Sequence, residues 1–188
     1  MYQVLAEFYE KKKDSVNLAA ILEKGRRIYP TNGYWDEIEL KTISEKGNKA
    51  ELYAHYDELI AKKPNEYTLN YNYAIELYNS IYTPDKRPAN ETELKAKLTT
   101  VLKNTIALDK GIDATVLMTN HLYNVAADLS TAGTMIKGIK PEDKAKKAEL
   151  KSNLTKKWTS ALPIATALLP GMKRNPALKP AKKMCTKM

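Results

Sequence analysis

Two similar stretches decide the predicted fold: Ile28-Tyr29-Pro30-Thr31-Asn32 and Lys62-Lys63-Pro64-Asn65-Glu66. Each follows a helical pattern and contains a proline, which cannot continue a helix and so marks its end. Pro30 and Pro64 lie 34 residues apart, which is the period of a repeat built from two helices. The sequence therefore predicts an array of helical hairpins.

A second pattern recurs along the chain: a large residue, a small residue, two unrestricted positions and another large residue. It occurs as Leu5-Ala6 with Tyr9, as Tyr73-Ala74 with Leu77, and as Val125-Ala126 with Leu129. This spacing places the large residues on one face of a helix with the small residue beside them. We expect the small side chain to let a second helix approach closely.

These marks predict four hairpins with eight helices, at about 2–13 and 16–29, 34–46 and 49–63, 66–82 and 91–109, and 113–131 and 142–169. Ser15 is the expected N-cap of the second helix. Gly47 can adopt the left-handed conformation that closes a helix, and Asn48 can cap the next one. A break is expected from Gly133 to Gly138.

The third and fourth hairpins are longer than the first two. Their predicted ends lie near Lys110 and Pro170, so both repeats exceed 34 residues. Insertions are best tolerated in connections. We therefore expect the extra length to fall between the two helices of each hairpin.

The composition fits a helical protein that does not cross a membrane. Only seven of the 188 residues are glycine, and no run approaches the roughly 20 apolar residues of a membrane span. The start of the chain lacks the basic and apolar regions of a signal peptide. The chain is then either not exported, and cytoplasmic as written, or a fragment without its leader, which would allow a periplasmic location. A start inside a helical pattern slightly favours a fragment.

A family resemblance rests on these segments: Leu22-x-x-Gly25-x-x-Ile28-x-Pro30, Asn72-Tyr73-Ala74-x-x-Leu77 and Asn124-Val125-Ala126-x-x-Leu129. Over residues 2–171 the chain resembles the tetratricopeptide repeat (TPR) family, and its long fourth repeat is similar to TPR proteins of Bacteroidetes-type bacteria. The resemblance implies an all-α protein, a right-handed α-α superhelix (TPR-like solenoid) of about four helical hairpins. It also implies a repeat domain at 1–171, followed by a basic tail at 172–188 that we expect to be disordered.

The resemblance further implies a concave groove lined by the first helix of each hairpin. The groove residues would be Gln3, Glu7, Glu37, Lys41, Tyr71, Tyr78 and Tyr123. Tyrosine offers contact area at a low entropy cost, which suits recognition of a peptide. The alternative is that these tyrosines pack against a neighbouring hairpin, as aromatic residues at helical spacing commonly do. A clamp for a peptide C-terminus is not expected, because Thr68, Tyr71 and Ile75 occupy the positions of its charged residues.

The sequence offers no set of residues for catalysis, a cofactor or a metal. His55 and His121 are the only histidines and fall in different predicted hairpins, and Cys185 is the only cysteine. Phosphate-binding, dinucleotide-binding and serine-hydrolase motifs are missing from the sequence. The interpretation is a non-enzymatic protein-interaction scaffold that binds a peptide or protein segment in the groove.

The basic tail supports an alternative function. It contains six basic residues and no acid, and so supplies most of the net charge of +9. Such a tail could bind nucleic acid or another acidic polymer, with binding that weakens steeply as salt increases. The tail has no aromatic residue on which bases could stack, so this alternative ranks well below the scaffold. An enzyme ranks lower still, and would need a pocket at the long fourth repeat.

Overall fold

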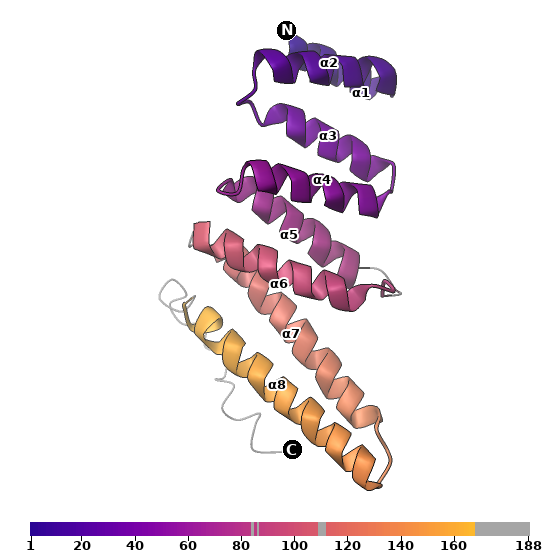
Figure 1. Ribbon diagram of the computed structural model, residues 1–188, viewed down its shortest axis with the longest axis vertical. Helices are drawn as coiled ribbons and strands as arrows, with labels where there is room; N and C mark the ends of the chain where they lie inside the picture. Colours follow the sequence, from indigo (N-terminus) through magenta and orange to yellow (C-terminus); the bar gives the residue numbers. More distant parts are fainter. Residues whose placement is uncertain (84, 86, 109–111, 168–188) are drawn as a thin grey trace, which may run out of the picture. The chain divides into compact units, whose positions relative to one another are not determined.

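The computed structural model describes residues 1–83, 85, 87–108 and 112–167, with the side chains of these residues except 158 and 160–167. All regular elements in these ranges are α-helices, so the prediction of an all-α chain is confirmed. The chain divides into two compact units, Met1–Leu69 and Asn70–Met188. Figure 1 labels the helices from α1 to α8.

The first unit contains two helical hairpins. Helices α1 (Tyr2–Lys11) and α2 (Ser15–Ile28) form the first, and α3 (Tyr34–Glu45) and α4 (Lys49–Lys62) form the second. Helix α2 packs against α3, so the second helix of one hairpin contacts the first helix of the next. A core cluster of Ala6, Leu18, Leu22 and Trp35 connects α1, α2 and α3.

The second unit contains most of α5 (Tyr67–Tyr82) together with α6 (Glu91–Leu108), α7 (Ile112–Met135) and α8 (Pro141–Ala167). Helix α7 contacts both α6 and α8. Hydrogen bonds from the Asn124 side chain to the Tyr78 hydroxyl and from the Tyr82 hydroxyl to His121 join α5 to α7. Helix α7 is therefore the central element of this unit.

The small residues of the repeated pattern are buried, as expected. Ala6, Ala74 and Ala126 are all inaccessible or nearly so to solvent. A larger side chain at any of these positions would have to displace a neighbouring helix, because protein interiors are close-packed.

One of the predicted helix caps is wrong and two are confirmed. Asp14, not Ser15, is the N-cap of α2, and its carboxylate accepts a hydrogen bond from the Asn17 backbone N–H at 3.1 Å. The positive end of the helix dipole also stabilises a carboxylate at this position. Asn48 caps α4 through the Glu51 backbone N–H at 3.2 Å, and Gly47 has the left-handed φ of 75°.

The break expected from Gly133 to Gly138 instead spans residues 136–140, so its start at Gly133 is wrong. The expected place of the extra length is wrong for the fourth hairpin, whereas in the third hairpin residues 83–90 separate α5 from α6, compared with residues 12–14 and 46–48 in the first two. Helix α7 continues through Gly133 to Met135, and only residues 136–140 separate it from α8. The additional residues lengthen α7 and α8 to 24 and 27 residues instead of forming a long connection. A glycine inside a helix costs about 1 kcal/mol relative to alanine, and the packing of α7 on α8 can offset that cost.

Candidate interaction surface

The predicted groove residues of the first unit lie on α1 and α3, and all four are exposed. The Tyr34 hydroxyl donates to the backbone oxygen of Gln3 at 3.2 Å, which joins the two helices. The Lys41 ammonium lies 2.6 Å from a carboxylate oxygen of Glu10, a second link between them. Because Glu10 offsets the charge of Lys41, the exposed carboxylates of Glu7 and Glu37 leave this face acidic.

The predicted groove residues of the second unit lie on α5 and α7. Tyr78 is half-buried, and its hydroxyl accepts a hydrogen bond from the Asn124 side chain at 3.0 Å. Tyr71 is also half-buried, and burial together with the charge of Asp113 raises its pKa. Tyr123 is 60% exposed. Two of the three tyrosines are thus partly buried by packing, and Tyr123 is the most exposed of the three.

Tyr123 belongs to an apolar row on α7 that the sequence interpretation did not include. Ile112 is 51% exposed and Val116 is 41% exposed. These residues precede Tyr123 by 11 and 7 positions, so all three share one helix face. The opposite face is buried through Ala114, Met118 and His121, and Leu122 and Ala126 are buried on one flank. We call Ile112, Val116 and Tyr123 the α7 stripe, and the spacing of four and seven residues was its sequence signal.

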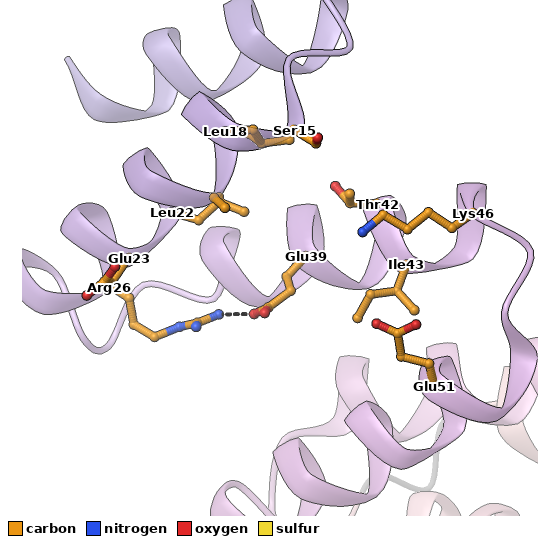
Figure 2. Close-up of a pocket in the computed structure, with 11 residues that line it drawn as sticks. Ser15, Leu18, Leu22, Glu23, Arg26, Glu39, Thr42, Ile43, Lys46 and Glu51 are labelled. Carbon is orange, nitrogen blue, oxygen red and sulfur yellow. Dashed lines mark hydrogen bonds and ion pairs between the residues drawn. The ribbon is translucent and has the colours of Figure 1, made fainter.

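A separate pocket of about 260 Å³ lies in the first unit between α2 and α3. Figure 2 shows the apolar side chains of Leu18, Leu22 and Ile43 lining it, with the ion pair of Arg26 and Glu39 on one side. The sequence interpretation placed the binding residues on α1 and α3, and did not predict this pocket. It is open to solvent and lies just below the range of about 300–1,000 Å³ that is usual for small-molecule sites.

Charged groups beside this pocket are paired with one another. One carboxylate oxygen of Asp36 accepts from Arg26 at 3.1 Å, and the other accepts from the Lys63 ammonium at 2.6 Å. Glu39 also binds Arg26 and lies 3.3 Å from Nε2 of His55. A buried carboxylate requires such partners, so this cluster links α2, α3 and α4 and has a structural role.

His121 is the centre of a second buried polar cluster. The Thr99 hydroxyl donates to the Lys95 backbone oxygen at 2.8 Å, so its oxygen is free to accept from Nε2–H of His121 at 2.9 Å. Nδ1 of His121 then accepts from the Tyr82 hydroxyl at 2.8 Å. This assignment gives a neutral imidazole whose two nitrogens are both occupied.

Burial and nearby charge keep this imidazole neutral. Burial, and then the positive charges of Lys95 and Lys157, lower the pKa of His121 to about 4. Burial and the charge of Asp128 raise the pKa of Tyr82. The Lys95 ammonium lies 2.6 Å from the Asp128 carboxylate, which further ties α6 to α7. This arrangement stabilises the packing of α5, α6 and α7 and leaves no nitrogen of His121 for a substrate.

The remaining chemical expectations concern metals, membranes and the tail. Within residues 1–83, 85, 87–108 and 112–167, no three His, Cys, Asp or Glu side chains come together to hold a metal ion. None of the described helices has the length and apolar character needed to cross a membrane. The basic tail at 172–188, including Cys185, lies outside the described residues.

Comparison with known proteins finds no protein similar to this chain. No protein-family model matches it, and no curated protein or solved structure matches it either.

Proposed function

We propose that this chain is a TPR-like solenoid and acts as a non-enzymatic interaction scaffold, which binds a peptide or protein segment on the first helices of its hairpins. The pairing of α1 with α2, α3 with α4 and α7 with α8 supports the solenoid. So does the contact of α2 with α3, because repeat arrays are built from contacts between neighbouring hairpins.

The α7 stripe is the observation that carries the proposed function. Single exposed apolar residues are common on protein surfaces, but Ile112, Val116 and Tyr123 extend along one face over three helical turns. A row at this spacing suits a segment that presents apolar side chains of its own, as in recognition of an amphipathic helix. The segment we propose therefore carries apolar residues at helical spacing.

The buried titratable side chains support a binding role over a catalytic one. His121 has hydrogen-bond partners at both nitrogens, and Asp36 has a cationic partner at each carboxylate oxygen. A general base must reach a proton on its substrate. Both groups are instead engaged in holding helices together.

Peptide selection followed by a binding measurement tests the proposal. Peptides would be selected on the immobilised chain from a random library, and their affinity measured by fluorescence anisotropy. We expect Val116→Ser combined with Tyr123→Ser to weaken binding by about tenfold or more, because each substitution removes apolar contact area. Val16→Ser on α2 is the matched control, since Val16 is also a well-exposed apolar residue.

The control also defines the contrary result. Unchanged affinity in the α7 variant would place the binding surface elsewhere. Equal losses in the α7 variant and in Val16→Ser would indicate nonspecific apolar adsorption in place of a defined surface.

A further inference from the structure

The turn between α7 and α8 exposes two large apolar side chains. Met135, the last residue of α7, is 73% exposed, and Ile139 in the turn is 82% exposed. Exposed lysines, Lys137 and Lys140, alternate with them. We call residues 135–140 the hairpin tip. Exposed apolar side chains on a turn do not form a concave binding pocket. They suit insertion into a deformable apolar layer.

The hairpin that carries this tip has no buried residue at its far end. From Ala127 to Lys157 every described residue is exposed or half-buried. The contact of Asp128 with Lys95 and Arg87 joins α7 to α6 and its preceding loop, and beyond it α7 runs on to the tip. Figure 1 shows the ends of α7 and α8 meeting at the turn past the start of α6. The tip is therefore accessible to a large flat partner.

A row of lysines leads away from the tip along α8. Lys140, Lys144, Lys147 and Lys151 follow one another at spacings of four, three and four residues, which places them along one side of the helix. Residues 135–157 contain eight lysines and three acidic residues. One of these acids, Glu142, lies 4.0 Å from Lys140. The excess positive charge complements an anionic surface.

Gly138 allows a close approach between the turn and the first turn of α8. A Cβ atom at Gly138 would overlap the carboxylate of Asp143 in the first turn of α8. Glycine thus lets the chain pass close to Asp143, and the Asp143 carboxylate sits at the positive end of the helix. This carboxylate is half-buried, and the eight lysines of residues 135–157 still outnumber it and the two other acids.

We propose that the hairpin tip binds the surface of a membrane containing anionic lipids. Met135 and Ile139 enter the boundary between headgroups and acyl chains, and the lysines of the tip and of α8 contact lipid phosphates. Reversible membrane attachment generally needs two weak signals together, such as an apolar insertion and a basic patch. The hairpin tip combines both within one turn and the helix that follows.

Flotation of the full chain with lipid vesicles tests this proposal. One set of vesicles contains phosphatidylcholine alone, and the other contains phosphatidylcholine mixed with phosphatidylglycerol. We expect binding to the anionic vesicles only, with affinity that falls as salt increases. Met135→Ser combined with Ile139→Ser should weaken binding by about tenfold or more. Lys140→Gln combined with Lys144→Gln should weaken it by about fivefold for each lysine removed.

The control and the contrary outcomes separate the tip from other parts of the chain. Val16→Ser, at an exposed position on α2, should bind the vesicles as the unmodified chain does. Equal binding by the Met135 and Ile139 variant would overturn the proposal and assign the attraction to charge alone, including that of residues 172–188. Failure of the unmodified chain to bind anionic vesicles would also overturn it, and would point to a protein as the partner of the tip. These variants leave the α7 stripe intact, so the result is independent of peptide binding.

Discussion

Gly25 on α2 and Trp35 on α3 are in direct contact. A Cβ atom at Gly25 would stand 2.5 Å from Cη2 of Trp35, closer than real Cβ atoms approach another heavy atom. The indole is almost fully buried, and its Nε1–H donates to the Tyr29 backbone oxygen at 3.1 Å. Trp35 is therefore fixed by both packing and a hydrogen bond, and α3 can approach α2 closely only because residue 25 has no side chain.

The Gly25→Ala substitution should destabilise the first unit. Alanine normally favours a helix over glycine by about 1 kcal/mol, but here its methyl group would collide with the Trp35 ring. We expect the free energy of unfolding to fall by about 1–3 kcal/mol, the usual range for overpacking. Urea denaturation followed by circular dichroism measures the change.

Gly133→Ala on α7 is the matched control. Apart from its chain neighbours and the backbone of its own helix, no heavy atom lies within 4 Å of the place where its Cβ would stand, so the substitution changes mainly the helix propensity. We expect the free energy of unfolding to rise by about 0.5–1 kcal/mol. If both substitutions stabilise the protein, the close contact between Gly25 and Trp35 is wrong.

The repeated sequence patterns predicted the helices well. Pro30 and Pro64 follow α2 and α4 within two residues, as expected. These features are local, because a proline ends a helix through its own missing N–H and its ring. The end of α7 was mispredicted, because Gly133 favours a break locally while the long-range packing of α8 decides the outcome.

The candidate surfaces were predicted only in part. Tyr123 was assigned to the binding face, but Ile112 and Val116 were not, although they follow the same helical spacing. The pairing of Asp36 with Arg26 and Lys63 joins three helices. Such a pairing depends on how the hairpins pack, and nothing in the local sequence indicates it.

Protonation of His121 should couple stability to pH. Its pKa is about 4 in the folded protein and about 6.5 when unfolded, so the unfolded chain binds more protons between these values. The stabilising contribution is present above about pH 6.5 and is lost as the pH falls towards 4, by about 3 kcal/mol at most. Urea denaturation across this range should show a steeper loss in the unmodified chain than in His121→Gln. Parallel curves would contradict the neutral, buried state of His121.

Tyr82→Phe should destabilise the second unit, although the volume of the side chain changes little. The substitution removes the hydroxyl that donates to Nδ1 of His121 and leaves that buried nitrogen without its partner. We expect a loss of about 1–3 kcal/mol in the free energy of unfolding. Tyr123→Phe is the control, because Tyr123 is largely exposed. Equal effects of the two substitutions would rule out a special role for the bond to His121.

Asp36→Ala should weaken the junction of α2, α3 and α4. It removes the acceptor shared by Arg26 and Lys63. We expect a loss of about 1–3 kcal/mol at low salt, reduced because the Arg26 side chain is partly exposed and screened by solvent. Glu58→Ala removes the exposed pair with Lys62 and a longer contact of 4.0 Å with Nδ1 of His55, and it should leave the urea midpoint nearly unchanged. A similar shift for both variants would contradict the structural role of Asp36.

The most direct test of the interaction scaffold is to locate a selected peptide on the chain by methyl NMR spectroscopy. Methyl resonances would be followed while the peptide is added, with Ile112 and Val116 reporting on the α7 stripe and Leu18 and Ile43 reporting on the pocket between α2 and α3. The proposed function predicts concentration-dependent shifts at Ile112 and Val116, with Leu18 and Ile43 unchanged. Shifts confined to Leu18 and Ile43, or no shifts at the α7 stripe under saturating peptide, would contradict it.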